Sequence, residues 1–326
     1  MPRIKLGTLP TPLVEAPRLS AALGGPRIFI KRDDLTGLGL GGNKVRKLEF
    51  IMADAKAKGA DILITTGGSQ SNFALQMTAT ARRLGMDVLL ILTRGVHPEM
   101  QGNQLLNHLL NAEVRIIEEG LDDLDKVYEI LNEAAEELRR KGRKPYVIPI
   151  GGFTPLGTAG YFNAALEIKQ QLEEQKVDVQ YIFMADGSGG THTGLMVGRK
   201  YLGMSWQLIG ISVLYSRDRL KAMIAEQANN LAELLGAGLN FSPDEVIVSD
   251  EYIGQGYGML TEGCIEAIRL VAQTEGIFLD PVYTGKAMSG LIDFIRKGKI
   301  SAEDTVIFMH TGGQAALFAY AGELAK

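Results

Sequence analysis

An alternation of apolar strand-like runs with helix-like segments constrains the fold of this chain more than any other feature. Strands are predicted in RIFIKRD, DILITTGG, DVLLILTRG, EVRIIEE, YVIPIGG, YIFMADGSGG, QLIGISVLY and DTVIFMHTGG. Helices are predicted from Lys44 to about Lys58 and in NFALQMTATARRLG, MQGNQLLNHLLNA and LDDLDKVYEILNEAAEELRRKG. Repeated strand–helix units imply parallel sheets covered by helices on both faces, so we expect an α/β fold.

The predicted strands in DILITTGG, YIFMADGSGG and DTVIFMHTGG end in a pair of glycines and then enter a helix. Ligands of open parallel sheets lie outside the carboxyl ends of the strands, so these strands are expected to point at one site. No internal repeat, low-complexity tract or long linker is present, and a border between domains is therefore expected to be a compact crossing.

Composition limits the classes of protein to which the chain can belong. Its 326 residues suffice for two domains or one large α/β unit. A net charge of −4 gives no electrostatic reason to expect nucleic acid or an anionic membrane as partner. The one cysteine, Cys264, excludes an intrachain disulfide framework and a cysteine-rich zinc site, and no metal is expected. The N-terminus lacks the apolar core of a signal peptide, which predicts a cytoplasmic location.

A lysine at the predicted start of a helix, Lys44, lies where a Schiff base can form. The positive end of the helix dipole favours its neutral, nucleophilic amine, and the preceding Asn43 can cap the helix. Lys44, Arg46 and Lys47 together oppose the usual preference for acidic residues at helix starts. An anionic ligand such as a phosphate would resolve this conflict, whereas the simpler interpretation is a solvated basic helix face.

A glycine-rich loop between a predicted strand and an apolar helix is the clearest candidate for phosphate binding. Its residues are Gly187, Ser188, Gly189, Gly190 and Thr191. Glycines let backbone N–H groups turn inward, the hydroxyls add donors, and the helix dipole favours an anion. The loop matches neither the Walker pattern nor a clean dinucleotide fingerprint. The alternative is a tight turn that merely needs glycines.

Four further segments carry hydroxyl or aromatic groups: TTGGSQSNFALQ, GQGYGML, LDPVYTGKAMSGL and HTGGQAALFAY. Their candidate residues are Ser71, Asn72, Tyr257, Tyr283, Thr284 and Thr311. Ser71 and Asn72 come at a helix start, where free N–H groups can hold a carboxylate, although either residue can also serve only as a cap. A tyrosine alone is more often a core residue with a satisfied hydroxyl.

With these segments in view, the chain resembles a known family along nearly its whole length. It is similar to the pyridoxal-phosphate enzymes that comprise D-cysteine desulfhydrase and 1-aminocyclopropane-1-carboxylate deaminase, which have the tryptophan-synthase β-like fold. The resemblance rests on TPLVEAPRLS, IFIKRDDLTGLGLGGNKVRKLEF, GGSQSN, YVIPIGGFTPLGTAGY, DGSGGTHTGL, GYG, DPVYTGKAMSGLI and HTGGQAALFAY. It implies a homodimer with pyridoxal phosphate as cofactor and a small amino acid as substrate.

The resemblance also implies a role for each candidate residue. Lys44 matches the lysine that forms the Schiff base and then removes the Cα proton as general base. Lys47 and the loop from Gly187 to Thr191 match the phosphate contacts. The remaining matches are Asn72 to the cofactor's phenolic oxygen, Ser71 to the substrate, Tyr283 to the face of the pyridine ring, Tyr257 to the substrate side, and Thr311 to the pyridine nitrogen.

Two threonines bear on the type of reaction. A neutral hydroxyl such as that of Thr311 stabilises a pyridinium less than a carboxylate would, which suits elimination of a leaving group. The cyclopropane-opening deaminases resemble DPVYEGK and have an apolar residue in the last loop, whereas this sequence has Thr284 and Thr311 at those places. Both differences favour the desulfhydrase branch.

Two positions depart from that branch, whose sequences usually read QSNH with an arginine two residues later. Here the residues are Phe73 and Leu75. If these side chains face the substrate, the preferred amino acid is bulkier or less polar than cysteine. If they face the packing between domains, the change is only repacking.

The resulting prediction is an enzyme that eliminates hydrogen sulfide from D-cysteine, leaving pyruvate and ammonia. Lys44, Ser71, Tyr257 and Tyr283 are its predicted catalytic residues, and Tyr283 or Tyr257 assists the leaving group. Residues 1–46 and 154–326 are predicted to form a large cofactor-binding domain, and residues 47–153 a small one. The alternatives are opening of aminocyclopropane carboxylate, action on an L-amino acid such as cysteate, a nucleotide-dependent oxidoreductase, and a cofactor carrier or sensor without turnover.

Overall fold

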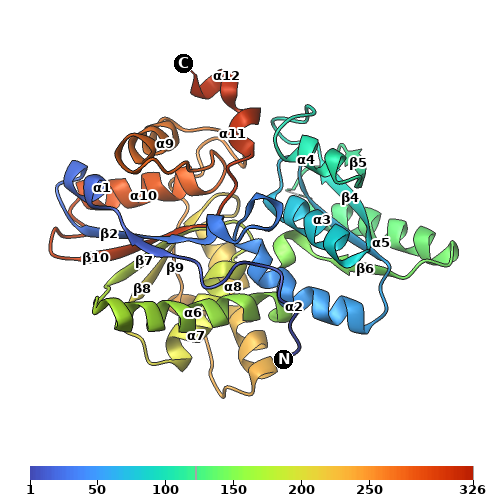
Figure 1. Ribbon diagram of the computed structural model, residues 1–326, viewed down its shortest axis with the longest axis horizontal. Helices are drawn as coiled ribbons and strands as arrows, with labels where there is room; N and C mark the ends of the chain where they lie inside the picture. Colours follow the sequence, from blue (N-terminus) through green and yellow to red (C-terminus); the bar gives the residue numbers. More distant parts are fainter. Residues whose placement is uncertain (122, 326) are drawn as a thin grey trace.

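The computed structural model describes residues 1–121 and 123–325 and contains two open sheets (Figure 1). The six-stranded sheet has the order β1-β2-β10-β7-β8-β9. Its strands are β1 (Leu13–Glu15), β2 (Arg27–Arg32), β7 (Tyr181–Asp186), β8 (Gln207–Ser212), β9 (Ile247–Ser249) and β10 (Thr305–His310). Its neighbouring strands are parallel except for β1, which runs antiparallel to β2.

The second sheet has four strands in the order β5-β4-β3-β6, all parallel to their neighbours. These strands are β3 (Ile62–Gly68), β4 (Asp87–Thr93), β5 (Glu113–Ile117) and β6 (Pro145–Ile148). Every strand predicted from the sequence is present in one of the two sheets. The unpredicted strands, β1 and β9, have three residues each, too few to carry a hydrophobic pattern.

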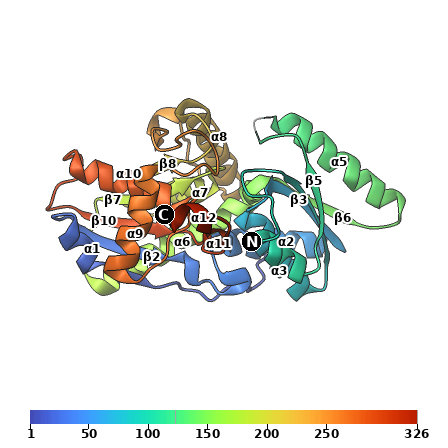
Figure 2. The same cartoon turned by 90° about the horizontal axis from the view of Figure 1, so that it is seen from above.

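Helices cover both faces of each sheet, as the alternating pattern predicts (Figure 2). In the six-stranded sheet one face packs on α6 (Pro155–Gln175), α7 (Gly190–Tyr201) and α8 (Arg217–Leu235), and the other on α1 (Pro17–Ala22), α9 (Glu262–Glu275) and α10 (Thr284–Arg296). In the four-stranded sheet one face packs on α2 (Lys44–Ala57) and α3 (Asn72–Leu84), and the other on α5 (Leu124–Arg140). The predicted α/β fold is therefore correct.

The other α-helices of the described chain are α4 (Asn103–Leu109), α11 (Ala316–Ala319) and α12 (Ala321–Leu324), and it also has short 3-10 helices. The prediction for α4 was too long, because Gly102 precedes the helix at a φ of +56°. The prediction for α5 began too early, and Asp122 within it lies outside the described residues. None of the described helices is long and apolar enough to cross a membrane.

The strands of the four-stranded sheet all fall between residues 62 and 148, inside the segment predicted as the small domain. Helix α2 contacts both halves, since it packs against α6 beside the large sheet and against α3 beside the small one. The domain boundaries after residues 46 and 153 stay a prediction.

Candidate active site

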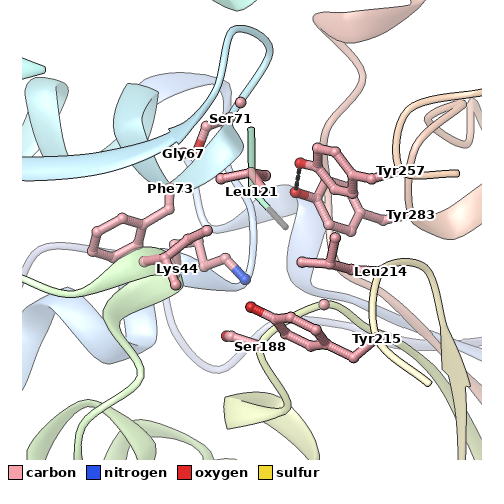
Figure 3. A pocket seen from close by; sticks show the side chains of 14 residues that line it. Lys44, Gly67, Ser71, Phe73, Leu121, Ser188, Leu214, Tyr215, Tyr257 and Tyr283 are labelled. Atoms are coloured by element: carbon pink, nitrogen blue, oxygen red, sulfur yellow. Dashed lines mark hydrogen bonds between the residues drawn. The ribbon is translucent and has the colours of Figure 1, made fainter. Parts of the chain in front are cut away.

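A pocket lies between the two sheets, at the carboxyl ends of β3, β7 and β8 (Figure 3). It is lined by Lys44, Gly67, Gly68, Ser71, Phe73, Leu121, Ile150, Gly151, Gly187, Ser188, Leu214, Tyr215, Tyr257 and Tyr283. The glycine-ended strands β3 and β7 thus serve one site, as predicted. The third, β10, ends beside it, because the carbonyl oxygen of Thr311 accepts a hydrogen bond from the backbone N–H of Asn43 at 3.0 Å.

Lys44 is the first residue of α2 and extends its amine into the centre of the pocket (Figure 3). Burial lowers the pKa of the amine to about 8, although the carboxylates of Asp186 and Asp280 act in the opposite direction. A lysine with this pKa carries a substantial neutral, nucleophilic fraction near neutral pH.

The start of α2 is capped differently from the sequence prediction. The side chain of Asn43 makes no capping hydrogen bond and donates through Nδ2 to the Thr191 hydroxyl at 3.0 Å. Gln76 of α3 instead accepts the N–H of Val45 at 3.0 Å. The prediction that Asn43 caps the helix is therefore wrong, and its side chain links the Lys44 helix to the glycine loop after β7.

The basic residues at the start of α2 do not form a solvated face. Arg46 is 2% exposed and donates to both carboxylate oxygens of Asp33, at 2.8 and 2.9 Å, and to both of Glu167, at 2.7 and 2.9 Å. Its charge is therefore neutralised inside the protein, and only the two lysines are left for an anionic ligand.

Lys47 is fully buried, and its ammonium donates to the carbonyl oxygen of Gly151 at 3.1 Å. Burial, together with the charge of Lys44, holds the pKa of Lys47 well below its usual range. A buried ammonium with a neutral carbonyl as partner is stabilised by a bound anion. A bound phosphate would raise this pKa again, so the position of Lys47 fits a phosphate group.

The glycine loop after β7 packs directly on Lys47. A Cβ at Gly190 would lie 2.5 Å from Lys47 Nζ, so this position admits only glycine while the ammonium is in place. Gly189, the residue before α7, has a φ of +85°, and α7 has no side-chain cap at its first N–H groups. Uncapped N–H groups beside a buried cation fit a phosphate dianion. The site accordingly fits the phosphate of pyridoxal phosphate.

Ser71 and Asn72 lie at the start of α3, as the sequence predicts. Ser71 lines the pocket while its hydroxyl accepts the N–H of Ala74 at 3.2 Å. Asn72 accepts a hydrogen bond from the side chain of Asn103 at 2.7 Å, and its own Nδ2 lies so close to Gly313 that a Cβ there would be 2.6 Å away. Asn72 therefore faces the loop after β10.

Tyr257 and Tyr283 line the side of the pocket opposite the glycine turn of β3, with their hydroxyl groups hydrogen-bonded to each other (Figure 3). Burial raises the pKa of both phenols, so both remain protonated at neutral pH. Thr284 does not line the pocket; its hydroxyl donates to Asp280 at 2.7 Å. Thr311 is buried beside the start of α2 and is likewise not in the lining.

The pocket also contains residues that the sequence did not single out. Leu121, Leu214 and Tyr215 line it, and Tyr215 was assigned to a strand that in fact ends at Ser212. Of the two departures from the desulfhydrase pattern, Phe73 lines the pocket and Leu75 does not, although both are buried.

Comparison with known proteins shows the family to which the chain belongs. A family model for the pyridoxal-phosphate dependent enzymes matches residues 4–312. A D-cysteine desulfhydrase of Klebsiella pneumoniae subsp. pneumoniae is 45% identical over 98% of this chain and 96% of its own length, and the protein of K. pneumoniae strain 342 matches equally.

Among solved structures, a homologue of aminocyclopropane carboxylate deaminase aligns with a TM-score of 0.91 and 41% identity over 100% of this chain and 96% of its own. An L-serine ammonia-lyase of Rhizomucor miehei aligns with a TM-score of 0.68 over 99% and 97%, but at 18% identity this likeness shows the fold alone. The fold is tryptophan-synthase β-like, and the interpretation as a nucleotide-dependent oxidoreductase is excluded. The chain belongs to the family of pyridoxal-phosphate dependent enzymes and is a lyase of the desulfhydrase and deaminase type.

Proposed function

We propose that this lyase eliminates hydrogen sulfide from D-cysteine and produces pyruvate and ammonia. The observation that carries the proposal is the Lys44 amine, which has a lowered pKa and shares one pocket with the glycine loop and the two tyrosines. The 45% identity with a D-cysteine desulfhydrase over almost the whole chain supports this choice of substrate.

The residues that line the pocket and those packed around it would divide the work of binding. Lys44 would hold the cofactor covalently, while Lys47 and the loop from Gly187 to Thr191 would hold its phosphate. Tyr283 would pack on the ring. Asn72, Thr284 and Thr311 would bind the ring's polar atoms, directly or through the loops at Asp280 and Gly313. When bound, pyridoxal phosphate acts as an electron sink for negative charge at the substrate Cα.

The substrate carboxylate would bind at the start of α3. Ser71 lines the pocket there, and the first N–H groups of the helix carry the positive end of its dipole. The Lys44 amine would then take the proton from Cα as general base. The walls of Phe73, Leu121 and Leu214 exclude water from the reacting atoms.

The leaving group needs a proton donor. The C–S bond breaks with its electron pair on sulfur, and the paired hydroxyls of Tyr257 and Tyr283 would supply a proton to the departing hydrosulfide ion. The remaining 2-aminoacrylate takes up water and gives pyruvate and ammonia. Each D-cysteine therefore consumes one water and releases one hydrogen sulfide.

The experiment that tests the proposal compares the wild-type enzyme with Lys44→Ala. Wild type should show the visible absorbance of bound pyridoxal phosphate, be labelled at Lys44 after borohydride reduction, and release sulfide from D-cysteine. Lys44→Ala should lose the label and turnover together. Sulfide release by a Lys44→Ala enzyme would refute the role of the amine, and labelled wild type without sulfide would refute the substrate.

A second candidate reaction is the opening of aminocyclopropane carboxylate, favoured by the 41% identity with the deaminase homologue. Parallel incubations with the different amino acids distinguish the reactions by their products. Aminocyclopropane carboxylate would give 2-oxobutanoate, and cysteate would give sulfite. A bound cofactor with no product from any of these amino acids would indicate a carrier or sensor. The similarity of the chain to this family also supports our proposal that the protein is a cytoplasmic homodimer. Light scattering tests the oligomeric state, and cell fractionation tests the location.

A further inference from the structure

Tyr215 contributes a third phenol to the pocket, on the loop between β8 and α8. Its side chain is 4% exposed, and among the residues that the structure describes its hydroxyl has no hydrogen-bond partner. Tyr257 and Tyr283, in contrast, bond to each other. A buried hydroxyl without a partner loses its hydrogen bonds to water and gains none in return. It therefore lowers the stability of the fold unless a ligand forms the missing hydrogen bond.

The position of Tyr215 relates it to the phosphate side of the pocket. The loop after β8 runs beside the loop after β7, since the N–H of Val213 donates to the carbonyl oxygen of Asp186 at 3.0 Å. Tyr215 and Ser188 both line the pocket, and in Figure 3 the Tyr215 hydroxyl points into it, toward the Lys44 amine. The opposite side, at Ser71, is where the substrate carboxylate would bind.

The surroundings of Tyr215 keep it a hydrogen-bond donor. Burial raises the pKa of its phenol, against the nearby charge of Arg219 and together with the nearby phenol of Tyr128. The Arg219 guanidinium lies 4.6 Å from the ring centroid, and the carbonyl oxygen of Tyr215 accepts the Ser212 hydroxyl at 2.6 Å. These contacts fix the ring while leaving the hydroxyl free.

Each terminal oxygen atom of a phosphate dianion can accept more than one hydrogen bond, so the anion can take a donor in addition to Lys47 and the glycine loop. Lys47 offers one ammonium, which also donates to Gly151, and the start of α7 offers its first N–H groups. We propose that the Tyr215 hydroxyl donates a hydrogen bond to the phosphate of pyridoxal phosphate and so completes the anion site from the β8–α8 loop. This inference depends on the cofactor, and not on D-cysteine as the substrate.

The test is a comparison of two ligands on two variants. Tyr215→Phe keeps the ring and its stacking on Arg219 and removes only the hydroxyl. Tyr146→Phe is the matched control, since its hydroxyl bonds Asp54 at 2.6 Å outside the pocket. Dissociation constants of pyridoxal phosphate and of pyridoxal, which lacks the phosphate, are measured with the apoprotein of each variant and of wild type.

We expect Tyr215→Phe to raise the dissociation constant of pyridoxal phosphate roughly ten- to hundredfold, the range for loss of a hydrogen bond to a charged group. The dissociation constant of pyridoxal should stay within about twofold of the wild-type value. The retained affinity for pyridoxal also shows that the variant is folded. In the holoenzyme the phosphorus NMR resonance of the cofactor should move in Tyr215→Phe and stay in Tyr146→Phe.

Two results would overturn the inference: unchanged affinity for pyridoxal phosphate, or equal weakening of both ligands in a variant that unfolds at the wild-type temperature. The second result would place the hydroxyl on another part of the ligand. Neither depends on turnover, so a failure of wild type to release sulfide from D-cysteine would refute the proposed substrate and leave this test intact.

Discussion

Arg46→Met is the substitution whose effect on stability follows most directly from the structure. The guanidinium of Arg46 is the shared partner of two carboxylates, with four hydrogen bonds of 2.7 to 2.9 Å to Asp33 and Glu167. Asp33 is fully buried, and its other partners are the hydroxyls of Thr11 and Tyr161. Methionine fills much of the same volume but leaves the Asp33 charge without this partner.

The size of the effect can be worked out in two ways. Burial alone would raise the pKa of Asp33, but Arg46, Lys31 and the Tyr161 hydroxyl outweigh it and lower the pKa from 3.8 to about 2. That difference corresponds to about 2 kcal/mol of folding free energy at neutral pH. Because the folded pKa is the lower one, this stabilisation is complete above pH 3.8 and is lost as the pH falls toward 2.

Removing one partner of a buried ion pair leaves the other charge buried without compensation, which typically costs about 3 to 5 kcal/mol. This is more than the free energy that corresponds to the lowered pKa of Asp33. Lys31 still donates to Glu167 at 2.5 Å and remains as a countercharge. We therefore expect Arg46→Met to lower the free energy of unfolding by about 3 kcal/mol at neutral pH. Asp33→Asn in the same chain should recover part of this loss, since it removes the uncompensated charge.

Urea unfolding followed by the fluorescence of Trp206 measures this change. Trp206 is the one tryptophan of the chain, is 1% exposed, and belongs to the same core as Tyr161. Arg27→Met is the matched control, because Arg27 also pairs with a carboxylate, that of Glu15, but both side chains are roughly half exposed. The control should lose less than about 1 kcal/mol, and an equally small loss in Arg46→Met would refute the reasoning.

Three further predictions concern the pocket. Lys47→Gln should raise the dissociation constant of pyridoxal phosphate roughly ten- to hundredfold without an equal effect on pyridoxal, and equal effects would contradict a phosphate contact. Phe73→His should raise kcat/KM for D-cysteine relative to S-methyl-D-cysteine, by roughly tenfold, because it makes an apolar wall polar; an unchanged ratio would mean that Phe73 is only packing. The rate of cofactor uptake by the apoprotein should rise with pH to a plateau with its midpoint near 8, since burial sets the pKa of Lys44 there and the neutral amine is the reactive form; stopped-flow absorbance would show a flat profile if the amine were not titrating.

The sequence predicted what depends on local pattern. The strands and the glycines that end β3 and β7 are encoded in short segments, and the carboxyl ends of parallel strands meet at one edge, so the meeting of Ser71 and Gly187 in one pocket was predictable. The identity of the cofactor was predicted from the resemblance to a known family. Neither source required knowledge of how distant side chains pair.

The errors came from contacts between segments far apart in the chain. Asn43 has the ordinary side chain of a helix cap, but Gln76 of another helix takes that role. Arg46 was grouped with the lysines because nothing near it in sequence shows that Glu167, 121 residues away, neutralises it. Tyr215 was overlooked because the apolar run of β8 continues past Ser212, where the strand ends.

The three cations of α2 have different partners because of the spacing of a helix. Lys44 and Lys47 are three residues apart and share a face, whereas Arg46 is rotated by roughly 200° from Lys44 and faces the other way. On that side Asp33 and Glu167 form ion pairs with Arg46, and these ion pairs fix the orientation of α2 about its own axis. The same rotation directs both lysines toward the pocket, one to the reacting atoms and one to the glycine loop. Three positive charges at the start of a helix are unfavourable. Here the charge of Arg46 is neutralised by carboxylates of the protein, and that of Lys47 would be neutralised by the cofactor's phosphate. Lys44 loses its proton and becomes the nucleophile.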